Sequence, residues 1–256
     1  MSSDLVILER KGGVSILTLN RPDDMNAISS ALMNRLTECF RSLQDDDETR
    51  VAIVTGAGRA FCAGMDLKEL SSGGDESTGG KIGNPVAEAI ADFEGPIIAA
   101  VNGYAVTAGF ELALACDLII ASTEAKFADT HAQVGMLPGW GLSQRLPRII
   151  GMPRAMELSL TGNKLTARQA DEWGLVNRVV EPDELMPTCL ALANDMLSCQ
   201  PDALRGCKRL MVEGSGMPLA EALAYETREA KAWADQVTAT AIGKRRGVVQ
   251  TRNRAQ

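Results

Sequence analysis

Short, uninterrupted apolar runs that alternate with glycine-containing turns and helical segments most constrain the fold of this 256-residue chain. The runs VAIVTG (51–56), PIIAAVN (96–102) and LIIAS (118–122) carry hydrophobic residues at consecutive positions. Strands of this kind are typically buried on both faces, as in a parallel sheet covered by helices on each side. The repeated order of strand, turn and helix therefore predicts an α/β fold.

The N-terminal segment predicts a hairpin followed by a helix. Two β-rich runs, VILER and VSILTLN, flank the glycine pair Gly12 and Gly13, which is a typical hairpin pattern. Ser29 or Ser30 is a suitable N-cap, and apolar residues then recur at helical spacing as far as Leu43.

The second half of the chain predicts a change of architecture. Residues 71–84 are rich in Gly and Ser without periodicity, which indicates a mobile loop. Beyond about residue 143 the pattern becomes mainly helical, with one brief strand in VNRVVE, a helix over DELMPTCLALANDML and two more helices after it. We expect a core domain of residues 1–199 and a helical region of residues 200–256.

Composition and charge exclude several classes of function. With 45% hydrophobic and 23% charged residues the chain can bury a full core. The first residues lack the pattern of a signal peptide, and no apolar run approaches the ~20 residues that span a bilayer, so we expect a cytoplasmic protein without membrane contact. The net charge of −7 disfavours a nucleic-acid partner.

The C-terminal segment KRRGVVQTRNRAQ departs from this acidic balance, because it carries five basic residues and no acid. It could contact a small polyanion, or it could be a solvated, frayed end. The six cysteines form no C-x-x-C pair and lie among apolar neighbours, which predicts buried free thiols and no metal site. They are Cys39, Cys62, Cys116, Cys189, Cys199 and Cys207.

Two turns of small residues follow apolar strands and are candidate ligand sites. The first spans residues 58–67, and the second spans residues 101–111 and leads into a helix. Glycine and alanine let a ligand approach the backbone, and a helix N-terminus favours an anion. Two such turns facing each other could form an oxyanion hole, or they could be tight connections without a ligand. Neither matches the glycine motifs of ATP or NAD sites.

Four long segments that include these turns occur in order along the chain: AFCAGMDL, AAVNGYAVTAGFELALACDLIIAS, KFADTHAQVGMLPGWGLSQRLPRIIG and LTGNKLTARQADEWGLVNRVV. Together they resemble the crotonase superfamily, the enoyl-CoA hydratase/isomerase family, over nearly the whole chain from about Leu5 to Arg246. The resemblance implies an α/β fold of the crotonase type, a spiral of repeated ββα units with a C-terminal helical trimerisation region. It also implies a homotrimer or a dimer of trimers.

The resemblance further implies an acyl-CoA thioester as substrate. Coenzyme A is then part of the substrate, and no other cofactor and no metal is needed. The backbone N–H groups of Met65 and Ala108 are the implied oxyanion hole, and Lys244 is implied to reach the CoA phosphates. The full set of implied substrate contacts is Met25, Ala27, Ala63, Gly64, Asp66, Leu67, Tyr104, Thr130, Leu137, Pro138 and Lys244.

The implied catalytic pair is Glu111 and His131, the only histidine of the chain. Hydratases of this family hold one water between two carboxylates, and His131 stands where the second glutamate is usual. Two carboxylates repel, whereas a carboxylate and an imidazole attract. Glu111 could also be a first-turn acid that complements the helix dipole, and His131 could be a structural side chain or a proton donor or acceptor.

The leading hypothesis is an enoyl-CoA hydratase-like lyase that adds water to a 2-enoyl-CoA through an enolate stabilised by backbone donors. Two alternatives remain open at this level. One is another crotonase-fold acyl-CoA enzyme, namely an isomerase, a decarboxylase or a thioester hydrolase. The other is an acyl-CoA binding protein without catalytic activity, which the histidine at position 131 suggests.

Overall fold

The computed structural model describes residues 5–72 and 85–255. The chain forms two compact units, residues 1–205 and residues 206–256. None of the helices within the described ranges is long and apolar enough to cross a membrane.

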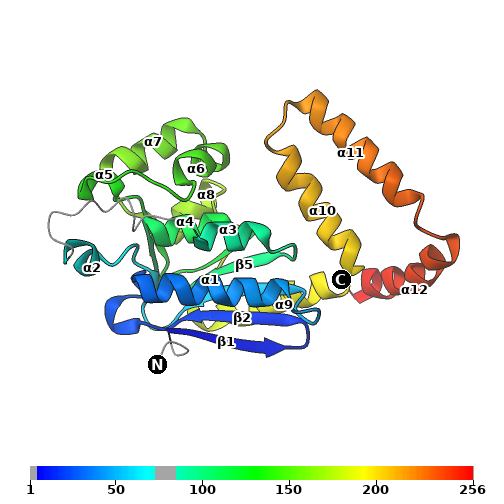
Figure 1. The fold of residues 1–256 in the computed structure, drawn as a ribbon, viewed down its shortest axis with the longest axis horizontal. Helices are drawn as coiled ribbons and strands as arrows, with labels where there is room; N and C mark the ends of the chain where they lie inside the picture. Colours follow the sequence, from blue (N-terminus) through cyan, green and yellow to red (C-terminus); the bar gives the residue numbers. More distant parts are fainter. Residues whose placement is uncertain (1–4, 73–84, 256) are drawn as a thin grey trace. The chain divides into compact units, whose positions relative to one another are not determined.

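The larger sheet of the first unit has six strands in the order β1-β2-β3-β5-β7-β10. Its strands β1, β2 and β5 are labelled in Figure 1. The strands β1 and β2 form the predicted antiparallel hairpin, and every other neighbouring pair is parallel. The three apolar runs form the central strands β3, β5 and β7, as predicted. The bounds are β1 (Val6–Lys11), β2 (Val14–Leu19), β3 (Val51–Gly56), β5 (Ile97–Val101), β7 (Leu118–Ser122) and β10 (Arg178–Val180).

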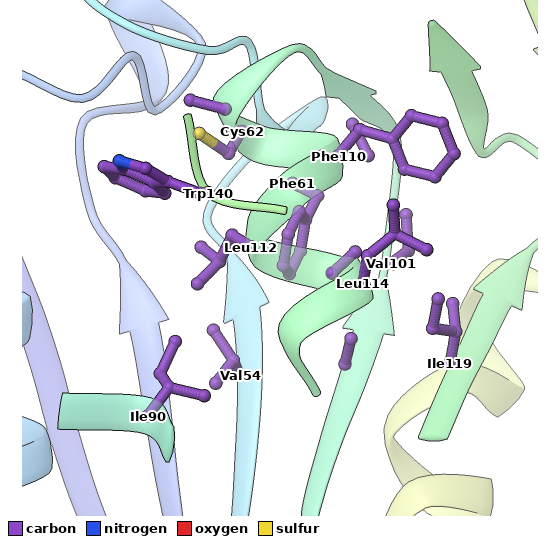
Figure 2. Close-up of a cluster of buried hydrophobic side chains, with 14 of the residues drawn as sticks. Val54, Phe61, Cys62, Ile90, Val101, Phe110, Leu112, Leu114, Ile119 and Trp140 are labelled. Atoms are coloured by element: carbon purple, nitrogen blue, oxygen red, sulfur yellow. The ribbon is translucent and has the colours of Figure 1, made fainter. Parts of the chain in front are cut away.

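Helices cover both faces of this sheet, which explains why its central strands are apolar at consecutive positions. Ala52 and Val54 of β3 pack in one core cluster, whereas Val51 and Ile53 pack in a second cluster on the opposite face. The first cluster lies under α1 (Ser30–Gln44), α3 (Pro85–Asp92) and α4 (Ala108–Ala115), and the second lies under α9 (Leu185–Leu197). Figure 2 shows part of the first cluster, with side chains from α4 packed against the sheet.

The first helix begins where the sequence indicates. Ser29 caps α1, because its side chain accepts a hydrogen bond from the backbone N–H of Leu32 at 3.2 Å. The apolar residues at helical spacing in this segment are buried. The cap and the apolar face together fix the position of α1 above the sheet.

A second sheet, which the sequence analysis missed, has the order β4-β6-β8-β9. Its strands are β4 (Ala60–Cys62), β6 (Tyr104–Val106), β8 (Lys126–Ala128) and β9 (Leu165–Thr166). Both predicted small-residue turns contain one of these strands. In three successive repeats, β3-β4-α2, β5-β6-α4 and β7-β8-α5, the first strand joins the large sheet and the second joins the small sheet before a helix follows, which confirms the ββα repeat implied by the resemblance.

The prediction that the chain becomes mainly helical after about residue 143 is confirmed. The first helices there are α6 (Leu142–Ile150), α7 (Met152–Thr161) and α8 (Ala167–Glu172), and two shorter helices, α2 (Leu67–Ser71) and α5 (His131–Val134), precede them. The loop predicted for residues 71–84 begins at the end of α2, and residues 73–84 lie outside the described part of the chain.

The expectation of two helices after α9 is wrong, because three follow. They are α10 (Pro201–Gly214), which crosses the boundary between the units, α11 (Leu219–Ala234) and α12 (Ala239–Ala255). Residues 244–255 of the basic C-terminal segment belong to α12, so this part is helical and not a frayed end. Its sequence contains glycines and lacks apolar periodicity, so the pattern of hydrophobic residues did not predict a helix there.

The expectation that all the cysteines are buried is also wrong. Cys39, Cys62 and Cys189 are buried, but Cys207 on α10 is exposed, and Cys116 and Cys199 are partly exposed. Apolar neighbours in sequence do not bury a residue that lies on the open side of a helix. Burial raises the pKa of the Cys62 thiol to about 12, which keeps this thiol protonated and unreactive.

Candidate active site

One pocket of the first unit lies where both small-residue turns meet the segment from Thr130 to Trp140. Most of its lining is apolar, and the polar side chains are Thr107, Glu111, Thr130 and His131. The complete lining consists of Ala63, Met65, Leu67, Leu70, Thr107, Ala108, Glu111, Thr130, His131, Val134, Met136, Leu137, Gly139 and Trp140.

The two turns touch each other at Gly64 and Thr107. A Cβ atom on Gly64, which has φ +98°, would lie 2.6 Å from Thr107 Oγ1, so only glycine fits there. Thr107 has φ 50° and ψ −114°, an outlier for a β-branched residue that costs about 1–3 kcal/mol. This strained residue directly precedes Ala108, the first residue of α4. The backbone strain therefore sits at the point where the turn enters the pocket.

Two backbone N–H groups at these turns are left for a ligand. The bridge between Ile28 and Met65 uses the carbonyl of Gly64 and the N–H of Asp66. It leaves the Met65 N–H without a hydrogen-bond partner in residues 5–72 and 85–255. The Ala108 N–H belongs to the first turn of α4, where helical N–H groups lack an intrahelical acceptor. Both residues line the pocket.

Gly109 holds α4 close to the small sheet. A Cβ atom at this position would lie 2.1 Å from the carbonyl oxygen of Cys62, the last residue of β4. Phe110 packs against Phe127 of β8 with ring centroids 5.3 Å apart. These contacts fix the helix that carries Ala108 and Glu111.

Glu111 lies in the first turn of α4 and is 2% exposed. Its Oε1 accepts hydrogen bonds from the backbone N–H groups of Trp140 (2.8 Å) and Leu142 (3.2 Å), where α6 begins. Burial raises the pKa of this carboxyl, while the amides of Leu142 and Trp140 and the nearby His131 act in the opposite direction. The side chain is therefore anchored through one oxygen, and Oε2 faces the pocket.

His131 is the first residue of α5 and is nearly buried. Its Nδ1 lies 2.7 Å from Oδ1 of Asp129, and the backbone N–H of His131 donates to the same oxygen at 3.2 Å. Nε2 points the other way and lies 3.7 Å from Oε2 of Glu111. This gap is longer than a direct hydrogen bond, and a single water about 2.8 Å from each atom fits it.

The pocket is lined by some of the catalytic and substrate-binding residues that the resemblance implies. Its lining includes Ala63, Met65, Leu67, Ala108, Glu111, Thr130, His131 and Leu137, and it does not include Met25, Ala27, Gly64, Asp66, Tyr104, Pro138 or Lys244. Lys244 belongs to the second unit.

Asp66 and Tyr104 have partners outside the pocket. The Asp66 carboxylate caps α2 and pairs with Arg21 at 3.0 Å, so both of its oxygens are engaged. The Tyr104 ring lies 5.4 Å from the ammonium groups of Lys126 and Lys164. In this structure the two side chains therefore contribute to the scaffold.

Two residues of the site, Asp129 and Thr107, were not predicted from the sequence. Asp129 is buried and bonded to the only histidine, and a signal was available, because an acid two residues before a histidine can reach Nδ1 across a turn. Thr107 left no such signal, because nothing in the sequence indicates that this β-branched residue adopts a positive φ.

The pocket of this ββα fold places a buried carboxylate 3.7 Å from an imidazole, an arrangement that is typical of enzymes that use acid–base chemistry. The family model described as Enoyl-CoA hydratase/isomerase matches residues 9–244. The chain therefore belongs to the enoyl-CoA hydratase/isomerase family.

Individual relatives agree with the family model. Over 242 residues the chain is 39% identical to a probable peroxisomal enoyl-CoA hydratase 1 of Arabidopsis thaliana, covering 93% of this chain and 90% of that protein. It is 40% identical over 223 residues to the (E)-benzylidenesuccinyl-CoA hydratase of Thauera aromatica, covering 86% and 87%. The crystal structure of an enoyl-CoA hydratase subunit from Geobacillus kaustophilus superposes with a TM-score of 0.85 at 35% identity, covering 91% and 90%.

Proposed function

We propose that this protein adds water across the double bond of a 2-enoyl-CoA. The observation that carries the proposal is the gap of 3.7 Å between Glu111 Oε2 and His131 Nε2, which lies in the pocket beside Met65 and Ala108. The family and the names of the relatives support the same reaction.

The thioester carbonyl binds between the two turns. Its oxygen accepts hydrogen bonds from the N–H groups of Met65 and Ala108, the proposed oxyanion hole. When water attacks the conjugated double bond, negative charge moves onto this oxygen as an enolate. Fixed donors that point at such a charge each contribute about 3–4 kcal/mol to transition-state stabilisation.

Glu111 acts as general base and then as general acid. The water oxygen forms a bond to C3, and one water proton passes to Glu111 Oε2, while the π electrons move to the thioester oxygen. The enolate then collapses, and its electron pair forms a C–H bond at C2 with the proton that Glu111 returns. His131 holds the water through Nε2. Nothing is oxidised or reduced, so the proposal needs no redox cofactor and no metal.

The mouth of the pocket suits an apolar acyl chain. Leu67, Val134 and Leu137 line it and are respectively 53%, 42% and 84% exposed, although they are large hydrophobic residues. Such side chains gain free energy when a ligand covers them. The CoA portion is proposed to lie along residues 25–27 and 63–67, with Lys244 near its phosphates.

The second unit is proposed to mediate self-association into a trimer or a dimer of trimers. Its helices expose large apolar side chains, including Met211 (69%), Leu219 (76%) and Ile242 (61%). Helices with such faces are stabilised by a partner surface. Light scattering of the purified protein tests this, with a mass of three or six chains expected and a monomer contradicting it.

The decisive experiment mixes the purified protein with crotonyl-CoA and follows the loss of the conjugated thioester absorbance. Turnover that Glu111→Gln abolishes supports the proposal. Tight binding of CoA esters without turnover would instead indicate a binding protein. Turnover restricted to 3-enoyl or malonyl-type esters would indicate another reaction of the same enolate.

A further inference from the structure

Asp129 is a buried carboxylate that the reaction outlined above does not use. It directly follows β8 and is 2% exposed. Its Oδ1 accepts from the backbone N–H of His131 and lies 2.7 Å from the ring Nδ1. The hydroxyl of Ser159, on α7, also bonds to this carboxylate.

These partners keep Asp129 ionised. Burial alone raises the pKa of the carboxyl, but the hydrogen bonds from His131 and Ser159 outweigh it and the net pKa is lowered. An ionised carboxylate is only an acceptor, so the group that faces it must donate. The contact at 2.7 Å therefore requires a proton on Nδ1.

We propose that Asp129 is a positioning residue that keeps the proton of the neutral His131 ring on Nδ1, so that Nε2 faces Glu111 as a hydrogen-bond acceptor. The catalytic meaning of this arrangement rests on the proposed hydration. A side-chain partner on one ring nitrogen commonly decides the state of the other.

The tautomer determines how the reacting water is oriented. With Nε2 and Glu111 Oε2 both accepting, the water donates one hydrogen to each and its lone pairs stay free for attack on C3. A proton on Nε2 would instead donate into a lone pair and compete with the attack. Within the described residues, the charged groups that face His131 are Glu111 from α4 and Asp129 after β8, while α7 contributes only the neutral hydroxyl of Ser159.

The chain offers a direct measurement, because His131 is its only histidine. Protein labelled with ¹⁵N-histidine gives one pair of ring nitrogen signals without assignment, and their chemical shifts and proton couplings report the tautomer. We expect a protonated Nδ1 and an unprotonated Nε2 in the pH range in which the enzyme is active. Protonation of Nε2 alone, or of both nitrogens across this range, would overturn the proposal.

Substitution of Asp129 extends the measurement to activity. Asp129→Ala should move the proton toward Nε2 and lower kcat at least about tenfold with a smaller change in KM, because the water is misoriented while the substrate still binds. Asp129→Asn, which keeps the shape and the contact to the backbone N–H, should shift the tautomer in the same direction by less. The matched control is Asp171→Ala on the exposed surface of α8, which should leave both readouts unchanged.

The outcomes separate this inference from the proposed function. An unaltered tautomer and kcat in folded Asp129→Ala protein would overturn the role of Asp129. The expected tautomer in a protein that does not hydrate crotonyl-CoA would support the assignment of the proton while overturning the hydratase.

Discussion

Two walls of one pocket hold Glu111 and His131 by different means. On the α4 wall, Glu111 is fixed by the backbone N–H groups of Trp140 and Leu142. On the opposite wall, His131 is fixed by the side chain of Asp129. Backbone donors do not titrate and survive substitution of their side chains, whereas a carboxylate partner depends on its identity and charge. The position of Glu111 on the α4 wall should therefore tolerate changes of pH and of neighbouring side chains, whereas the position of His131 depends on the charge and identity of Asp129.

The largest loss of turnover is expected when Glu111, the proposed acid–base group on the α4 wall, is substituted. Glu111→Gln keeps an oxygen for the amides of Trp140 and Leu142 but cannot take up a proton from water. We expect turnover of crotonyl-CoA to fall about 10²- to 10⁴-fold. Steady-state kinetics measure it, with circular dichroism as the control for folding. A loss of less than tenfold would remove Glu111 from the mechanism.

Substitutions at two glycines, one in each wall of the pocket, test how tightly each wall is packed. Gly109→Ala forces a Cβ atom against the Cys62 carbonyl and should lower the free energy of unfolding by about 3 kcal/mol. Gly135, which ends α5 with φ +74°, has open space around it, so Gly135→Ala should cost only about 1 kcal/mol of backbone strain. Urea unfolding of both variants gives the comparison. Equal losses would contradict the view that close packing fixes the α4 wall.

A smaller loss of turnover is expected when His131, on the opposite wall, is substituted. His131→Gln should lower kcat about 10- to 100-fold, because the water loses its second anchor. In the unsubstituted protein kcat should fall as pH decreases, because Glu111 must be unprotonated to accept the water proton, and burial raises the pKa of Glu111, so the fall should begin at a higher pH than for an ordinary glutamate. The same fall in acid should persist in His131→Gln, because it comes from Glu111. A fall toward alkaline pH that His131→Gln removes would instead identify His131 as a proton donor.

The smallest expected effect is on the thermal stability of the Glu111→Gln variant as pH changes. Because burial raises the pKa of Glu111 in the folded state, its contribution to stability is present at low pH and is lost as pH rises through the folded-state pKa. Glu111→Gln should therefore unfold at a higher temperature than the unsubstituted protein at alkaline pH, and the difference should shrink in acid. Thermal unfolding at several pH values measures this. A difference that grows in acid would mean that the carboxylate is stabilised by its surroundings.

The sequence predicted the elements whose pattern is local. The apolar runs of β3, β5 and β7 and the capped helix α1 carry their own signals of periodicity and capping, and all were confirmed. The strands of the small sheet were not predicted, because β4, β6 and β8 have only three residues each and pair with segments far along the chain. Helix α12 was missed because its sequence lacks an apolar stripe.

By itself the sequence predicted the α/β class from its apolar runs, and its resemblance to the enoyl-CoA hydratase/isomerase family implied the ββα repeat and the pair Glu111 and His131. Only the tertiary structure decided that Gly64 and Thr107 abut, that the amides at the start of α6 anchor Glu111, and that Asp129 orients His131. The reason is physical. Hydrogen bonds and close contacts act over a few ångströms in space, and most of the groups that they join here are tens of residues apart in the chain.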